Sequence, residues 1–246
     1  MPQNAGIAYN DSLPGTAADG AAKTQTTDRY GAMQTRAELL AWAEQGSYFR
    51  ALASGTPGTG IAQAITTSFS ATAVPLVMVN GSATKKIIPH YIRLVNTAAG
   101  STTTSSLAAI SIDSANRYSS GGTDISGFIY CANSALGPST AVSVLRAGVV
   151  TASAAGGGTR YLSNVSLKAA AAPCWVVGDE VLFVFADAAM SGSAGALTGT
   201  TPVCIVKNVG PVVLGGQDDS LILHLWNPAN ATTAPSWAFE IAWWER

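Results

Sequence analysis

The chain has 246 residues and a formal net charge of −1, and its 13 basic and 14 acidic residues make up only 11% of it. It contains no basic cluster of the kind that neutralises phosphates, which excludes nucleic acid as a partner. No window approaches the roughly 18 apolar residues of a membrane helix, and the first residues lack the basic and apolar regions of a secretion signal. We therefore expect no membrane partner and no secretion through such a signal.

The low charge is the main clue to the class of protein. Hydrophobic residues make up 48% of the chain, whereas the charged fraction is less than half of the roughly 25% typical of soluble domains. Much of the surface must then consist of Ser, Thr, Ala and Gly, and such a surface loses little solvation when another protein covers it. We expect a protein that associates with itself and with other proteins.

The N-terminal segment is too polar to fold alone. Residues 1–27 are dominated by Ala, Gly, Thr, Asn and Gln, and their large apolar side chains are few. Such a segment buries too little apolar surface to offset its conformational entropy. It is either disordered or an extended arm that becomes ordered on a neighbouring molecule.

One helix is predicted, at about residues 35–46. The sequence from Thr35 to Glu38 forms a capping box, an apolar stretch follows, and Gly46 marks the end. A helix of about ten residues is marginal in isolation, so Leu39, Trp42 and Ala43 must pack against the β domain of the same chain or against another subunit. A further turn at residues 47–52 and a Gly/Thr/Pro linker at 55–60 complete an N-terminal arm of residues 1–60.

From residue 61 the pattern is that of an all-β domain. Short β-branched and aromatic runs alternate with segments of Gly, Ser, Thr and Pro, as in sandwiches and barrels. We predict a two-sheet sandwich of jelly-roll type, with no fixed internal repeat and about nine strands: Leu76–Asn80, Ile87–Val95, Leu107–Asp113, Ile125–Cys131, Val142–Val150, Val181–Asp187, Val203–Val209, Leu221–Trp226 and Trp237–Trp244.

The last predicted strand alternates most clearly. Trp237, Phe239, Ile241 and Trp243 share one face, which we assign to the core. Trp244 then points outward near the end of the chain. An exposed indole at such a position is typical of an interface.

No catalytic or metal-binding arrangement is recognisable. The chain has only two histidines, His90 and His224, and we expect both to be hydrogen-bonded structural residues within strands. No nucleophile elbow or phosphate-binding loop occurs, and the adjacent acidic residues at 179–180 and 218–219 are expected to lie in turns that precede strands. We predict no catalytic residue, no metal and no cofactor.

The three cysteines fit no ligand pattern either. Cys131, Cys174 and Cys204 lie far apart within apolar runs, and we expect them to be buried thiols. Their odd number argues against a disulfide framework and is consistent with folding in a reducing cytoplasm.

Two parts of the sequence carry a resemblance to a known class. These are the C-terminal run, in which Leu221–Trp226 is followed by an Asn-Pro loop and by residues 237–246, and the Thr56–Gly60 stretch that leads into Thr66–Phe69. In texture, residues 47–246 resemble virion structural proteins of tailed bacteriophages, most closely the capsid decoration, or cement, proteins.

This resemblance implies a mostly β, often trimeric protein that is made in the host cytoplasm and is located on the capsid surface of the virion. It would be non-enzymatic, would bind the major capsid protein on the outside of an assembled capsid, and would bridge neighbouring capsomers. The alternative from another class is a receptor- or carbohydrate-binding module of a phage tail or fibre, which would require exposed aromatic residues in its loops.

Aromatic residues near the arm and at the C-terminus are the candidates for partner contacts, because aromatic side chains dominate such interfaces. The alternative, that these rings pack the helix onto its own sandwich, stays open at this stage. The candidates are Tyr30, Trp42, Tyr48, Phe49 and Trp244.

Overall fold

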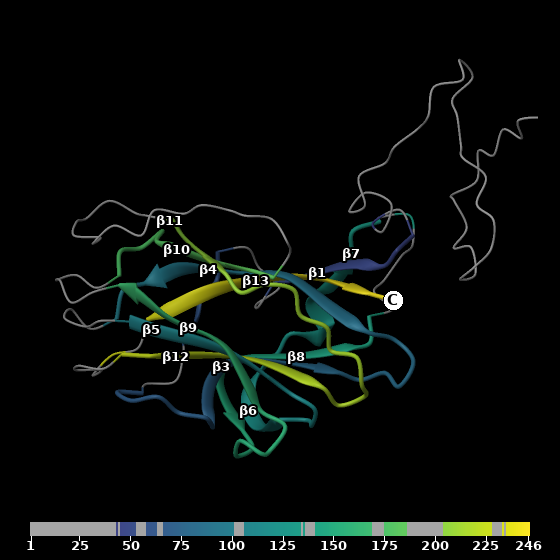
Figure 1. The fold of residues 1–246 in the computed structure, drawn as a ribbon. Helices are drawn as coiled ribbons and strands as arrows, with labels where there is room; N and C mark the ends of the chain where they lie inside the picture. Colours follow the sequence, from purple (N-terminus) through teal and green to yellow (C-terminus); the bar gives the residue numbers. More distant parts are fainter. Residues whose placement is uncertain are drawn as a thin grey trace, which may run out of the picture.

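The protein is an all-β molecule with two sheets packed face to face, as predicted (Figure 1). In this computed structural model the described residues are 43, 45–52, 58–62, 66–100, 106–133, 135, 141–168, 175–185, 204–227, 233 and 235–246. They form thirteen strands and one 3-10 turn, η1 (Ser126–Phe128). No helix among them is long and apolar enough to cross a membrane.

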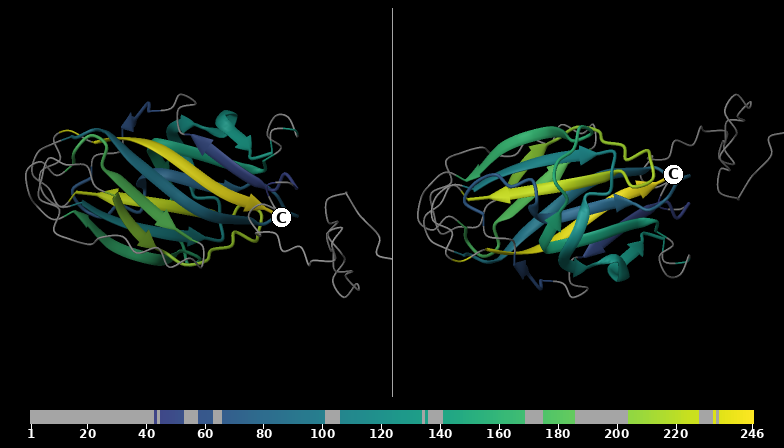
Figure 2. Two further views of the ribbon diagram at one scale, coloured as in Figure 1. Left: turned by 90° about the horizontal axis from the view of Figure 1, so that it is seen from above. Right: turned by 90° about the horizontal axis from the view of Figure 1, so that it is seen from below.

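The larger sheet has the strand order β11-β10-β4-β13-β1-β7, and the short strand β2 also pairs with β13. Seen from above, the yellow β13 lies beside the blue β4 (Figure 2). Its strands are β1 (Tyr48–Leu52), β2 (Ile61–Ala62), β4 (Ile87–Ala98), β7 (Ile129–Cys131), β10 (Glu180–Val184), β11 (Cys204–Asn208) and β13 (Ser236–Glu245).

The smaller sheet has the order β6-β8-β3-β12-β5-β9, with every pair antiparallel. Its strands are β3 (Ala73–Asn80), β5 (Ser106–Asp113), β6 (Tyr118–Asp124), β8 (Ser143–Ala152), β9 (Arg160–Lys168) and β12 (Ser220–Trp226).

The core lies between the sheets and follows the period-two pattern of the strands. Trp237, Phe239, Ile241 and Trp243 all face it, as predicted, and Phe49 of β1 stacks on Trp243 with ring centroids 6.1 Å apart. From the other sheet, β12 contributes Leu221, Leu223 and Leu225. Each such side chain contributes about 1.5–3 kcal/mol when fully buried, so this interface supplies most of the driving force for folding.

Glu245 connects the two sheets at the C-terminal end of β13. Its buried carboxylate accepts hydrogen bonds from the Val142 and Ser143 backbone N–H groups at the start of β8, and from Trp243 Nε1 at 3.0 Å. Hydrogen bonds to a charged acceptor are stronger than neutral ones. This carboxylate therefore fixes the sheets relative to each other at this end.

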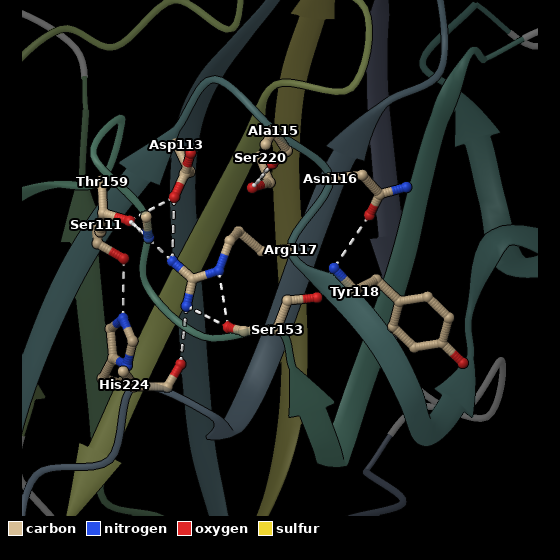
Figure 3. Close-up of polar contacts among 12 residues, drawn as sticks. Ser111, Asp113, Ala115, Asn116, Arg117, Tyr118, Ser153, Thr159, Ser220 and His224 are labelled. Atoms are coloured by element: carbon tan, nitrogen blue, oxygen red, sulfur yellow. Dashed lines mark hydrogen bonds and ion pairs between the residues drawn. The ribbon is translucent and has the colours of Figure 1, made fainter.

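Arg117 closes the outer face of the smaller sheet (Figure 3). The side chain is almost fully buried. Its guanidinium donates to the Ser153 carbonyl from Nε and Nη2 at 2.9 and 2.6 Å, to the Ala71 carbonyl at 3.0 Å, and to Asp113 Oδ2 and Thr159 Oγ1 at 3.1 and 3.0 Å. Three connecting segments are thereby held together over apolar residues of this face, Val74, Val77, Val79, Val150, Ala152 and Ile222.

The structure differs from the sequence prediction in several segments. Residues 48–52 form strand β1 instead of a further turn, and the Ser/Gly-rich stretch 118–124, expected to be a loop, is strand β6. The strand predicted at Ile125–Cys131 begins instead with η1, and β7 covers only its last three residues. The nine predicted strands are thus fewer than the thirteen observed, and β1 extends the sandwich upstream of residue 61.

The predicted helix at 35–46 lies mostly outside the described residues. Its last part is described: Ala43 is helical, and the Gly46 N–H donates to the Ala43 carbonyl at 3.0 Å. Gly46 has a φ of +73°, a left-handed conformation that commonly terminates helices and favours glycine. The predicted end of the helix at Gly46 is therefore confirmed.

Candidate functional site

A β-bulge shapes the outer face of the larger sheet. In the pairing of β4 with β13, Tyr91 lies opposite Ala242 and Pro89 lies opposite Trp243, which leaves His90 as an extra residue. Pro89 and Ile92 are buried, whereas His90 and Tyr91 are both partly exposed. Bulges of this kind redirect side chains and are frequent at functional sites. Here the bulge brings two consecutive rings to the outer face.

The rings of His90 and Tyr91 join two others to form the outer aromatic cluster, defined as Tyr48, His90, Tyr91 and Trp244. Tyr48 and Trp244 are direct partners in the pairing of β1 with β13, and their ring centroids are 5.6 Å apart. His90 lies 4.9 Å from the Trp244 ring, and its Nδ1 is 2.8 Å from the Tyr48 hydroxyl. Three strands thus contribute to one compact group.

An ion network borders this cluster on the same face. Arg93 of β4 donates to Glu180 of β10 at 2.6 and 3.1 Å and to Glu240 of β13 at 3.2 Å. The Tyr91 hydroxyl donates to Glu240 Oε1 at 2.5 Å, and Arg50 of β1 lies 4.0 Å from the same carboxylate. The two arginines balance the two glutamates, so the network has no net charge.

Burial keeps the aromatic cluster uncharged at neutral pH. Desolvation, followed by the positive charge of Arg50, lowers the pKa of His90 below its ordinary value of 6.5. Desolvation also raises the pKa of Tyr91, and its hydrogen bond to Glu240 adds to this effect. The face therefore presents neutral rings beside a balanced set of charges, an arrangement suited to protein contact.

The structure describes three of the five predicted contact residues. Tyr48 and Trp244 lie in the outer aromatic cluster, and Phe49 lies in the core, 1% exposed. Trp244 does lie on the outer side of its sheet, but the prediction that its indole is exposed is wrong, because Tyr48 and His90 pack against it and only 7% of the residue remains exposed. Tyr30 and Trp42 lie outside the described residues.

The second histidine is buried on the outer side of the smaller sheet. His224 Nδ1 lies 3.0 Å from the Ser70 carbonyl, which can only accept, so Nδ1 carries the proton and Nε2 accepts from the Ser111 hydroxyl at 2.8 Å. A serine that donates to an oriented histidine is the geometry of an activated nucleophile. Ser111 and His224 are, however, at most 1% exposed, so a substrate has no access to them in this conformation.

Both histidines are hydrogen-bonded residues of strands, as predicted. The expected neighbours of His90 are different, because Ile92 and Leu94 face the core while His90 lies on the outer face. The two histidines belong to different sheets, β4 in the larger and β12 in the smaller.

Two exposed rings lie next to His224. Phe69 and Tyr161 are 42% and 50% exposed and meet edge to face with centroids 5.5 Å apart. Phe69 also contacts His224 and Trp226. The sequence marked Tyr161 only as a residue at a loop margin, and Phe69 had no pattern around it that assigned it to a site.

The acidic pairs and cysteines form no cation site in the described parts of the chain, where no group of three or more His, Cys, Asp or Glu side chains could hold a metal ion. Asp179 and Asp219 accept from backbone N–H groups in turns before β10 and β12, as predicted. Cys131 is partly buried, and Cys204 is exposed at the edge strand β11, contrary to the expectation of a buried thiol. Cys174 lies outside the described residues.

A small pocket of about 80 Å³ lies between the smaller sheet and the segment before β12. Its lining includes Asp113, Arg160 and Asp219. Pockets for drug-sized ligands measure roughly 300 Å³ or more, so this one is too small for such a ligand.

Comparison with known proteins finds no matching family model, no similar curated protein and no similar solved structure.

The buried His224 predicts acid lability. Desolvation lowers its pKa to about 4, outweighing the opposite effect of the Ser70 carbonyl, and Arg117 lowers it further. Below pH 6.5 the unfolded chain therefore binds a proton that the folded chain does not, and the free energy of unfolding falls by about 3 kcal/mol as the pH drops from 6.5 to 4. Urea unfolding at pH 7, 5.5 and 4 measures this loss.

The matched variants for this prediction are His224→Gln, which should remove most of the decline, and His90→Gln, which should keep it. A wild-type unfolding free energy that stays constant between pH 7 and pH 5 would contradict the prediction.

Proposed function

We propose that the protein is a non-enzymatic virion structural protein that binds the outside of an assembled phage capsid and bridges neighbouring capsomers. The order of strands in the two sheets is the observation that carries this proposal. Its other supports are the low charge of the chain and the neutral outer face of the larger sheet.

Eight of the strands follow the order of a jelly roll. Taken along the chain they are β1, β3, β4, β5, β9, β10, β12 and β13. The first, eighth, third and sixth of them are neighbours in the larger sheet, and the second, seventh, fourth and fifth are neighbours in the smaller one, all in antiparallel pairs. Two interleaved Greek keys produce this order, and such domains build viral capsids as well as lectins.

The remaining strands modify the edges of this arrangement. β6 and β8 extend the smaller sheet beyond β3, and β7 and β11 are the edge strands of the larger sheet. On β7, Tyr130 is 55% exposed and pairs with Arg50 beside the outer aromatic cluster. The outer face thus continues into an exposed aromatic residue, the kind of side chain that anchors interfaces.

In this proposal the β domain forms a homotrimer on the capsid and the polar N-terminal arm reaches the neighbouring major capsid protein subunits. Several weak contacts then add through their effective concentration. Because the protein would bind the assembled shell but not its dissociated subunits, binding stabilises the shell by linkage.

Removing residues 1–34 is the sharpest test, because a deletion to residue 50 would remove part of β1 and damage the larger sheet. Light scattering should give a trimer for both the full chain and the shortened chain. Co-sedimentation with undecorated expanded capsids should show strong binding of the full chain and at least a tenfold loss without the arm. A monomer, a full chain that ignores capsids, or full-strength binding without residues 1–34 would contradict the proposal.

A second candidate function is a receptor- or carbohydrate-binding module. The exposed pair Phe69 and Tyr161 favours it, because sugars stack on exposed aromatic faces and Phe69 lies in the segment between β2 and β3. Jelly rolls include lectins as well as capsid proteins, so the strand order alone does not decide between the two functions.

A glycan array separates the two candidates. The capsid proposal predicts no glycan bound above background. The second candidate predicts binding that Phe69→Ala and Tyr161→Ala each reduce at least tenfold, while the control Tyr130→Ala, at an equally exposed tyrosine of the other sheet, leaves it unchanged.

A further inference from the structure

We propose that residues 35–42, which precede the described part of the chain, form an amphipathic helix that docks in cis on the outer aromatic cluster. The occupant of this face is thus the chain's own segment. The capsid proposal concerns what residues 1–34 contact, whereas this inference concerns where the arm is attached, and it holds whether or not the protein binds capsids.

The described chain begins on this face. Ala43 is helical and packs against the group formed by Tyr48, Ala242 and Trp244. Three residues later, the positive φ of Gly46 ends the helix and the chain turns into β1. The last turn of the helix is therefore fixed on the sheet, and residues 35–42 must leave from that point.

The sequence continues this contact by one helical side. Residues three and four positions before Ala43 share its side of a helix, and these are Leu40 and Leu39. Arg36 is one turn further back on the same side, whereas Ala41 lies on the opposite side. The capping box at Thr35–Glu38 begins the helix, so its whole apolar side is directed as Ala43 is.

The sheet offers apolar surface for these leucines. Tyr48 and Trp244 are 5% and 7% exposed although both belong to an outer face, and Ile88 and Tyr91 extend the same group while remaining partly exposed. A helix of this length is unstable alone in water, and burial of its apolar side stabilises it. The leucines and the partly exposed rings therefore satisfy each other's need for burial.

Docking at residues 35–46 sets the reach of the arm. The free part is then residues 1–34, which span at most roughly 110 Å when extended. Tyr30 belongs to this free part and stays a candidate for partner contact. Leu39 and Leu40 contact the sandwich, and Trp42 flanks them within the docked helix.

Limited trypsin digestion of the intact protein tests the docking. Cleavage is expected to be fast after Lys23 and Arg29, and at least tenfold slower after Arg36, because Arg36 lies in the docked helix. Leu39→Asp should make Arg36 as sensitive as Arg29, whereas the control Ala41→Asp, which adds the same charge on the opposite side, should leave Arg36 protected. Equal cleavage at Arg29 and Arg36 in the wild type would overturn the inference.

Thermal melting of two shortened chains gives an independent readout. Removing residues 1–34 should leave the Tm unchanged, and removing residues 1–42 should lower it by several degrees, since the outer aromatic cluster then loses its cover. Equal Tm values for the two shortened chains would also overturn the inference. Neither experiment involves capsids, so failure here and failure of the capsid proposal are separate results.

Discussion

The buried pair of Arg117 and Asp113 is the interaction on which the smaller sheet depends. The outer side of that sheet is apolar, with Val77, Val79 and Ile222 fully or almost fully buried there. A sheet that is apolar on both sides needs a second cover besides the core, and connecting segments provide it. Arg117 holds those segments by hydrogen bonds to carbonyls and to Asp113, so one side chain determines whether this face is closed.

The larger sheet meets the same requirement by other means. Its outer face is covered by rings from β1, β4 and β13, and the charges beside them are paired with each other. The few charges of the chain thus serve largely inside the structure, as Arg117, Asp113 and Glu245 illustrate. The low charge read from the sequence therefore reflects two sheets buried on both sides, as well as a surface suited to contact with other proteins.

Regular patterns in the sequence predicted the elements that follow them. The alternation from Trp237 to Trp243 correctly identified a strand and its core side. The Gly-rich strand β6 was missed because hydrogen bonds to β8, and not its own residue types, define it. The position of His90 was missed because a bulge shifts the period by one residue.

The candidate site was predictable only in its residue types. Tyr48 and Trp244 were identified as aromatic residues suited to contacts, but their burial depends on a pairing between strands almost 200 residues apart, which no local pattern encodes. Arg117 was overlooked for a similar reason, since a single arginine in a polar segment carries no signal of the carbonyls that surround it in the folded chain.

Urea unfolding of the Arg117→Met variant tests most directly the central claim that buried charges hold the outer faces closed. Removing the guanidinium leaves Asp113 buried without its cation, and such a loss costs about 3–5 kcal/mol. The control Arg146→Met removes an arginine that pairs with the half-exposed Asp124 and should cost much less. A loss of about 3 kcal/mol or more for Arg117→Met alone agrees with this account, and equal losses for the two variants would contradict it.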